Sequence, residues 1–251
     1  MSRHTPRFAL RLAGTEAEVA RAQALRYRVF VEELGGQGGP LTDRGAGREA
    51  DAFDAHCGHL LLLDALREDL VVGTTRVMAA EDAARAGGFA SEGEFDIGAL
   101  RRSGRRLLEV GRTCLDPDYR GSAAMHRLWQ GLAAVAKEKG IELLFGLASF
   151  AGTDPQAVAQ PLACLRRDHL APEALRPRSL RPLAAEPLAA LDRREAVLAM
   201  PALVKAYLRL GGTVGEGACL DPAFGCIDVC MVLDTALMPP LARAVYAGDA
   251  G

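Results

Sequence analysis

The sequence predicts an α/β fold with one mixed, twisted sheet and helices on both of its faces. Apolar runs of strand length recur along the chain, at residues 59–64, 70–78, 107–115 and 142–148. Between the last two runs, apolar residues follow the spacing of an amphipathic helix, at Leu128, Leu132, Val135 and Ala136. A strand, a turn, a helix and a second strand in this order form a unit in which the helix packs on the sheet. We expect the fold to be organised around residues 107–149.

The N-terminal part predicts a strand, a helix and a hairpin, in that order. Residues 8–12 alternate apolar and polar side chains, as a half-buried strand does. Thr15 and Glu18 have the spacing of a capping box, which predicts a helix as far as about Glu33. Residues 35–47 are rich in glycine, so we expect an irregular loop there. The next two apolar runs, separated by a turn, predict the hairpin.

The C-terminal part predicts an insertion followed by the last strands. The expected elements are helices at residues 154–169 and 201–210, an irregular stretch at 171–191, and strands at 213–220 and 226–233. Four prolines make the irregular stretch incompatible with a helix. We therefore expect residues 1–251 to form a single domain. In it, residues 150–200 are a helical, Pro/Arg-rich insertion, and residues 201–234 are a helix and strands that complete the sheet.

Composition excludes several classes of protein. With 251 residues, 49% of them hydrophobic, the chain can bury a large core. The formal net charge of −2 gives no overall attraction to nucleic acid or to an anionic membrane, so no nucleic-acid partner is expected. No apolar stretch is long enough to span a bilayer, and the N-terminus lacks the apolar core of a signal peptide. The six cysteines lack the spacing of a disulfide framework, which favours a cytoplasmic location.

The turn before the central helix carries a phosphate-binding pattern. Its residues are Leu115, Tyr119, Arg120, Gly121 and Ser122, the first four in the order Leu-x-Pro-x-Tyr-Arg-Gly. The free N–H groups and dipole of a helix N-terminus favour a phosphate. This segment resembles the acyl-CoA-binding segment of the GNAT N-acyltransferase superfamily, which implies that these residues bind the acyl donor. No second glycine follows Gly121, a departure that weakens the case for free CoA and leaves room for a phosphopantetheine arm on a carrier protein.

Four separate pieces of the chain resemble acyl-homoserine-lactone (AHL) synthases, which are GNAT-like enzymes supplied by acyl carrier protein. The pieces are Arg26 with Phe30, Asp51 with Asp54, Arg76 at the end of a Val-Gly-Thr-Thr-Arg strand, and Glu109 with Arg112. The tryptophan that those synthases carry shortly after the Arg…Phe pair is absent here.

A fuller resemblance, over about residues 20–234, is to the ornithine N-acyltransferase family and the related hemolysin-like acyltransferases. It rests on the segments Arg26–Phe30, Phe53–Leu60, Glu109–Arg112, Phe145–Phe150, Pro201–Gly211 and Asp221–Val229. This resemblance implies a GNAT-like, autoinducer-synthase-like fold. It also implies an acyltransferase that moves a 3-hydroxyacyl group from acyl carrier protein to the α-amino group of L-ornithine.

The product implied by this resemblance is lyso-ornithine lipid, the first committed intermediate of ornithine lipid synthesis. The co-substrate is then acyl carrier protein with its 4′-phosphopantetheine thioester, and neither a bound cofactor nor a metal is expected. Because the product is a lipid, we also expect transient, peripheral contact with the inner membrane surface.

The matched residues suit this chemistry. An amine must lose its proton before it attacks a thioester, and we expect Glu109 to be the general base, with Arg112 as the second catalytic residue. Ornithine carries two ammonium groups and one carboxylate, so its pocket needs acidic and basic side chains. Asp51 and Asp54 are expected to hold ammonium groups, and an arginine the carboxylate. The expected substrate-binding residues are Arg26, Phe30, Asp51, Asp54, Arg76, Ser149 and Phe150.

Simpler interpretations stay open. Glu109 and Arg112 could be a structural ion pair, and Asp51 and Asp54 could end a loop. The histidines of residues 56–59 suggest a metal, but no second ligand pair has matching spacing. The alternative functions are an AHL synthase and a non-catalytic GNAT-like domain that binds acyl carrier protein or lipid.

Arginine clusters offer docking sites for acyl carrier protein, which is acidic. Complementary charge speeds such an encounter. The first candidate is the cluster Arg101, Arg102, Arg105 and Arg106, next to the central strand. The others are Arg120 and Arg127, at the start of the central helix, and the set of arginines in residues 166–181.

Overall fold

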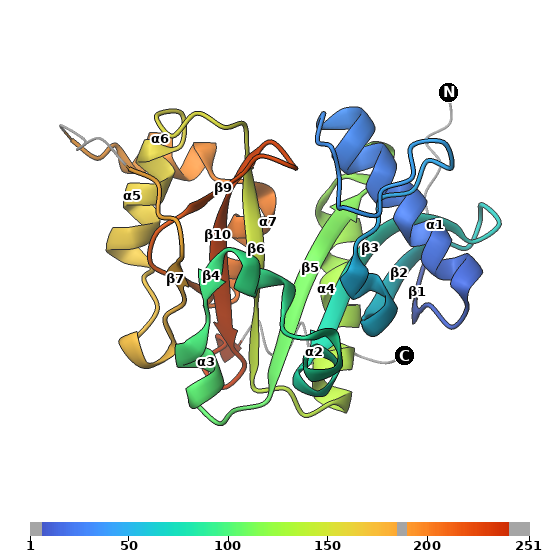
Figure 1. Cartoon of the computed structure of the whole chain (residues 1–251), viewed down its shortest axis with the longest axis horizontal. Helices are drawn as coiled ribbons and strands as arrows, with labels where there is room; N and C mark the ends of the chain where they lie inside the picture. The colour runs from blue at the N-terminus through green and yellow to red at the C-terminus, as the bar shows by residue number, and fades with distance from the viewer. Residues whose placement is uncertain (1–6, 185–189, 241–251) are drawn as a thin grey trace.

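The computed structural model describes residues 7–184 and 190–240. Eight strands form one sheet in the order β1-β2-β3-β5-β6-β10-β8, with β9 also paired to β10 (Figure 1). They are β1 (Phe8–Leu12), β2 (Gly58–Asp64), β3 (Leu70–Ala79), β5 (Leu107–Leu115), β6 (Leu143–Ala151), β8 (Thr213–Val214), β9 (Cys219–Asp221) and β10 (Cys226–Asp234). Only β5 and β6 are parallel to each other; the other pairs are antiparallel. The expected mixed sheet is confirmed.

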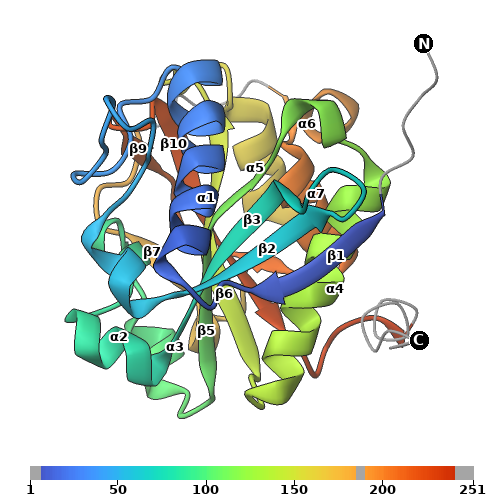
Figure 2. The ribbon, with the colours of Figure 1, turned by 90° about the vertical axis from the view of Figure 1, so that its right-hand side faces the viewer.

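Helices cover both faces of this sheet. They are α1 (Glu16–Arg26), which a π-helix (Tyr27–Glu33) continues, α2 (Ala80–Ala86), α3 (Gly98–Arg102), α4 (Ser122–Glu138), α5 (Ala159–Asp168), α6 (Arg193–Ala199) and α7 (Ala202–Arg209). Thr15 caps α1, as its spacing from Glu18 predicted. Figure 2 shows α1 and α4 on opposite sides of β1–β3. Among the described residues, no helix is both long and apolar enough to cross a bilayer.

The run of leucines in β2 serves both faces. Alternate side chains of a strand point to opposite sides, so Leu60 and Leu62 pack in the cluster that contains α4 residues such as Leu132. Leu61 and Leu63 pack against α1 on the other side. All four leucines are buried, which explains why the sequence of β2 is continuously apolar rather than alternating.

The two central strands separate halfway along their length. β5 and β6 pair over three residues only, Leu107–Glu109 of β5 with Leu143–Phe145 of β6. Just beyond the last pair, a Cβ on Gly146 would lie 2.0 Å from the Val110 carbonyl oxygen, so glycine allows the strands to pass closely there. Past this point β5 stays with β3 and β6 stays with β10, and Figure 1 shows the two strands diverging. The result is a V-shaped gap in the middle of the sheet.

Three expectations need correction near the C-terminus. Residues 213–220 form two short strands instead of one, because Gly217 has a left-handed φ of 81° that turns the chain. The helix expected from Asp154 begins at Ala159, after a turn in which Asp154 accepts a hydrogen bond from the Gln156 N–H. The helix α6 was not expected, and neither was the small sheet of β4 (Phe95–Asp96) with β7 (Arg178–Ser179).

Candidate active site

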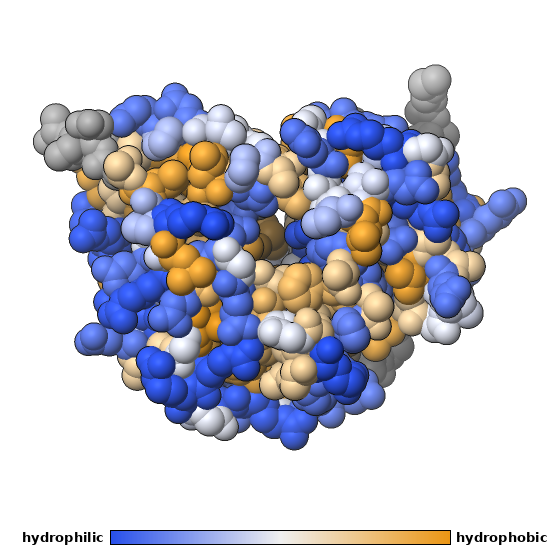
Figure 3. All heavy atoms as spheres, in the orientation of Figure 1, coloured by the Kyte–Doolittle hydropathy of each residue, from blue (hydrophilic) through white to orange (hydrophobic). Residues whose placement is uncertain are grey.

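A cavity of about 1,080 Å³ fills the gap between β5 and β6. Figure 3 shows the molecule hollowed between the half that carries α1 and the half that carries α5. Residues 110–115 of β5 line one side, and residues 147, 149 and 151 of β6 line the other. Since neither strand has a strand partner on this side, the backbone edges of the V face the cavity.

The cavity has an apolar wall and a polar wall. The apolar wall lies between α4 and α7 and includes Met125, Trp129, Leu203, Ala206 and Leu210. The polar wall includes Arg76, Ser91, Glu94, Glu109, Arg112, Ser149, Asp221 and Asp228. Such a cavity can hold an aliphatic chain on one side and a charged molecule on the other.

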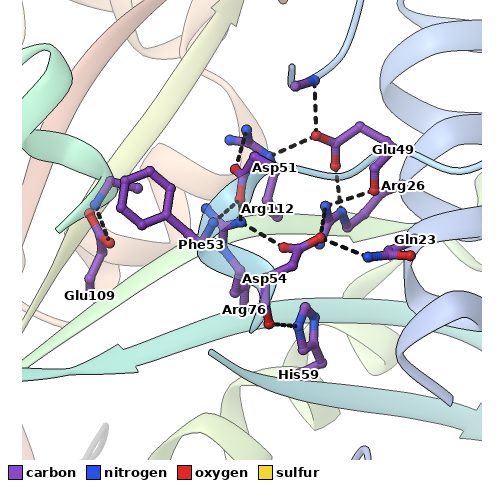
Figure 4. Close-up of polar contacts among 12 residues, drawn as sticks. Gln23, Arg26, Glu49, Asp51, Phe53, Asp54, His59, Arg76, Glu109 and Arg112 are labelled. Carbon is purple, nitrogen blue, oxygen red and sulfur yellow. Dashed lines mark hydrogen bonds and ion pairs between the residues drawn. The ribbon is translucent and has the colours of Figure 1, made fainter. Parts of the chain in front are cut away.

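Glu109 lies at the apex of the V, in the last residue pair before the strands separate. Its side chain is buried and lines the cavity. The carboxylate accepts hydrogen bonds from the Ala90 N–H (2.9 Å), the Ser91 N–H (2.6 Å) and the Ser91 hydroxyl (2.5 Å). These three donors fix the carboxylate without neutralising its charge. Figure 4 shows that it lies apart from the arginine side chains.

A buried ion network occupies the neighbouring wall. Its members are the arginines Arg26, Arg76 and Arg112 and the carboxylates Glu49, Asp51 and Asp54 (Figure 4). Arg26 holds Asp54 with two hydrogen bonds, of 2.8 and 2.9 Å, and reaches Glu49 at 2.5 Å. Arg76 bridges Asp51 and Asp54 at 2.5 and 2.7 Å. The formal charges of the six side chains balance.

Arg112 connects this network to the cavity. It contacts Asp51 at 3.0 Å and Glu49 at 3.3 Å, and its guanidinium lies 4.4 Å from the centre of the Phe224 ring. Its backbone has a φ of 51°, in the left-handed region that non-glycine residues rarely adopt. This strained residue interrupts the regular course of β5 and directs the side chain to the cavity wall. Arg112 and Glu109 are not paired with each other, so the structural ion pair considered above is not formed.

Charges within the network shift the pKa values of its members. Burial alone would raise the pKa of Asp54, but hydrogen bonds and charges of Arg26 and Arg76 outweigh burial and hold that pKa well below its usual range. Burial opposes the charged form of Arg76, yet Asp51 and Asp54 raise its pKa further above the ordinary value. These shifts favour the charged forms of Asp54 and Arg76, and every carboxylate in the network has an arginine partner.

This pairing changes the expectation for two residues. Asp51 and Asp54 were expected to hold ammonium groups of the substrate, but their carboxylates are already bound to arginines and neither lines the cavity. Arg26 is completely buried and also lies away from the cavity wall. Their role in the structure is to support Arg76 and Arg112, which do line it.

The other expected substrate residues divide in a similar way. Phe30 and Ser149 line the cavity, and the Phe30 ring packs edge-to-face on Phe224 with centroids 5.8 Å apart. Phe150 points into the main core, because neighbouring residues of β6 face opposite sides.

The expected donor segment reaches the cavity with three of its five residues. Leu115, Arg120 and Gly121 line it, and Arg120 forms an ion pair of 2.5 Å with Glu33. Tyr119 does not: its hydroxyl donates to Asp64 at 2.9 Å on the side of β1 and β2. Ser122 is the first residue of α4, and its side chain lies outside the described part of the structure.

The arginine cluster at residues 101–106 lies at the wrong end of α4 for donor docking. Arg106 lies beside Gly140, just after the C-terminus of this helix, whereas the donor segment precedes its N-terminus. A helix of 17 residues spans about 25 Å. Moreover, Arg101 and Arg105 are paired with Glu92 and Asp234. The structure therefore argues against the first docking candidate.

Three residues, at the end of β9 and the start of β10, could hold a metal ion. Ligand atoms of Asp221, Cys226 and Asp228 lie within 4.8 Å of one another. Burial and the neighbouring carboxylate of Asp228 raise the pKa of the Cys226 thiol, however, and a protonated thiol is a poor ligand. The donor set therefore fits a structural metal poorly.

Sequence reasoning missed Glu49 and Glu94. Glu49 is completely buried, and its negative charge balances the network. The matched segments contain three arginines and only two aspartates in this group, which indicated that a third carboxylate was needed. Glu94 lies in a segment that the sequence showed only as polar. Nothing in its neighbourhood along the chain indicated that it would reach the cavity.

Comparisons with known proteins agree with this geometry. Residues 25–130 match the acetyltransferase (GNAT) domain family. The chain is 51% identical to L-ornithine N(alpha)-acyltransferase of Rhodobacter capsulatus, over 95% of this chain and 94% of that protein. Two solved structures share the fold. One is FeeM, an N-acyl amino acid synthase from uncultured soil microbes (TM-score 0.56, 15% identity, 96% of this chain and 99% of that chain). The other is the AHL synthase LasI (TM-score 0.55, 13% identity, 98% of each chain).

The splayed sheet and the matched domain define a GNAT-type N-acyltransferase. Both the expected enzyme class and the autoinducer-synthase-like fold are thereby confirmed. Within that class, the identity over nearly the full length of both proteins shows that the chain belongs to the L-ornithine N(alpha)-acyltransferase family. The wider resemblance noted in the sequence is therefore the correct one, ahead of the resemblance to AHL synthases.

Proposed function

We propose that this protein transfers a 3-hydroxyacyl group from acyl carrier protein to the α-amino group of L-ornithine, giving lyso-ornithine lipid. The observation that carries the proposal is the open gap between β5 and β6, with the Glu109 carboxylate at its apex and an apolar wall beside it. The acceptor is inferred from the name of the Rhodobacter capsulatus relative.

The acyl donor fits the gap along its length. The amide groups of a phosphopantetheine arm can hydrogen-bond to the free strand edges as a missing strand would. Its phosphate would lie at the N-terminus of α4, near Gly121, where unpaired N–H groups favour an anion. The acyl chain would lie on the apolar wall between α4 and α7.

The carrier protein would approach at the same end of α4. Arg120 directly precedes the N-cap of α4, and the exposed side chains of Arg120 and Arg209 both line the cavity and supply positive charge toward an acidic partner. This location replaces the arginine cluster at residues 101–106 as the docking surface.

The acceptor would enter at the polar wall. Arg112 faces the cavity and can bind the α-carboxylate of ornithine, because a guanidinium matches a carboxylate with two parallel hydrogen bonds. Arg76, which is paired with Asp51 in the network, also lines the cavity and adds a second positive charge near this carboxylate. This arrangement brings the α-amino group toward Glu109 at the apex.

In the reaction the nitrogen loses two protons and receives the acyl group. Glu109, directly or through water, takes a proton from the α-ammonium group, and the amine nitrogen attacks the thioester carbonyl carbon. Backbone N–H groups of the splayed strands can stabilise the oxyanion. The C–N bond forms and the C–S bond breaks. The leaving thiolate takes up the second proton, which the nitrogen loses as it becomes an amide, and the first proton passes from Glu109 to solvent. No covalent enzyme intermediate is required, since the thioester is already activated.

Replacing Glu109 tests this mechanism. With 3-hydroxyacyl carrier protein and ornithine, Glu109→Gln should lower kcat about 100- to 10,000-fold, the usual contribution of a general base. Glu81→Gln removes an exposed acid on the neighbouring helix α2 and should leave kcat unchanged. Product mass should show the amide on the α-nitrogen. Wild-type turnover by Glu109→Gln would refute the role of Glu109, and equal use of acyl-CoA would refute the carrier protein as specific donor.

A further inference from the structure

Three acidic side chains that line the cavity form no ion pair within the described part of the chain. They are Glu94, Asp221 and Asp228. None of the ion pairs among residues 7–184 and 190–240 includes any of the three. In this they differ from the carboxylates of the arginine network, which lie on another part of the same wall.

The three acids are not equivalent. Asp221 has a structural task, since its Oδ1 accepts hydrogen bonds from the N–H groups of Ala223 and Phe224 at 2.8 and 3.1 Å. Asp228 is only 3% exposed, and the Cys226 thiol is 3.5 Å from its Oδ1. The Oε2 atom of Glu94 is buried and has no hydrogen-bond partner among the described residues. A buried carboxylate oxygen without a partner is destabilising, so this oxygen indicates a missing ligand.

The electrostatics of the cluster point to a cation. Burial, together with the charges of Asp228 and Asp221, raises the pKa of Glu94 to about 8. Burial also raises the pKa of Asp228, against the effect of hydrogen bonds to its side chain and of the positive charge of Arg112. A cation bound between these carboxylates would remove the penalty of ionising both.

We propose that Glu94 and Asp228 bind the side-chain ammonium group of the acceptor and so select diamino acids over neutral amino acids. This inference rests on the proposed function. Arg112 is close enough to Asp228 for its charge to be felt there, so one end of an amino acid can meet a guanidinium while the other meets the two acids. Ser149 lies opposite Asp228 in the β6–β10 pairing and adds a hydroxyl at the cavity wall. The α-amino group, between these ends, is left for Glu109.

The test compares ornithine with L-norvaline, which has the same carbon chain but no side-chain amine. The wild-type protein, Glu94→Gln, Asp228→Asn and the double variant are assayed with one acyl donor. In the variants, kcat/KM for ornithine should fall about 100-fold or more, mainly through KM, as when one partner of a buried charge pair is removed. Turnover of norvaline should stay the same or rise, so that the preference for ornithine collapses. Asp96→Asn, an exposed acid two residues beyond Glu94, should keep the wild-type preference.

The outcomes separate this inference from the proposed function. If both substrates lose activity in the same proportion, Glu94 and Asp228 support the fold or the chemistry instead, and the inference is wrong. If the wild-type protein acylates ornithine and norvaline equally well, no ammonium subsite exists. If the wild-type protein acylates neither, it is the proposed function that fails. Calorimetric titration of ornithine into the Asp228→Asn variant, in the absence of an acyl donor, measures the loss of binding directly. Circular dichroism checks that this variant is folded.

Discussion

The cavity wall contains two groups of buried carboxylates with opposite surroundings. In the network, Glu49, Asp51 and Asp54 are each bonded to arginines. At the β9–β10 end, Glu94 and Asp228 have no basic partner among the described residues. The pKa values of these groups reflect their surroundings. Arginines lower the pKa of Asp54, and burial raises the pKa values of Glu94 and Asp228. Carboxylates that are paired with arginines support the structure, whereas carboxylates that form no ion pair are available to a ligand.

The largest expected effect comes from opening the network. Arg26→Met should lower the free energy of unfolding by about 3–5 kcal/mol, because it leaves Glu49 and Asp54 buried without a partner. Urea denaturation measures the change. The matched control is Arg28→Met, at a position two residues after Arg26. It removes an exposed ion pair between Arg28 and Asp116 and should change the free energy of unfolding by less than about 1 kcal/mol. Equal effects of the two substitutions would mean that the network is not a structural support.

Acid should act on the network with a defined sign. The pKa of Asp54 is depressed in the folded state, so its stabilisation is present above the unfolded value near 3.8 and is lost as pH falls below it. In that range the wild-type unfolding free energy should fall more steeply than that of Asp54→Asn, by up to about 1.4 kcal/mol per pH unit. Denaturation curves between pH 4 and pH 2 measure both slopes. Parallel slopes would contradict an ionised, arginine-bound Asp54.

An effect with the opposite sign is expected at the end of the cavity that contains Glu94. The pKa of Glu94 is about 8 in the folded state and near 4.5 in the unfolded state, so ionising Glu94 destabilises the fold as pH rises between these values. Glu94→Gln should therefore gain stability relative to the wild type as pH increases through this range. Melting temperatures at pH 5, 6.5 and 8 measure the trend, with Asp96→Asn as the control. A gain that is independent of pH would show that Glu94 is already ionised at pH 5.

The sequence was informative where structure depends on local pattern. The strand, helix and strand of residues 107–149 follow from periodicity and from the turn at Asp116 and Pro117, and the structure confirms them. The break at Gly217 was not visible, because a glycine in an apolar stretch is compatible with both a continuous strand and a turn.

Partner choice in the candidate site could not be predicted in the same way. Arg112 meets Glu49 and Asp51 across 63 and 61 positions of sequence, and the motif gives residue types without saying which charges neutralise one another. Asp51 and Asp54 therefore looked available for a substrate, although arginines hold both. Glu94 gave no signal, since its importance arises from a missing partner, which only the folded chain reveals.

The close passage of β5 and β6 at Gly146 sets where the gap for the acyl donor begins. β6 is paired with β10 along all nine of its residues, and β5 is paired with β3 on both sides of this crossing, so each arm of the V keeps an outer neighbour. The gap between the strands is therefore present before the acyl donor arrives, and entry of the donor does not require the strands of the sheet to separate first.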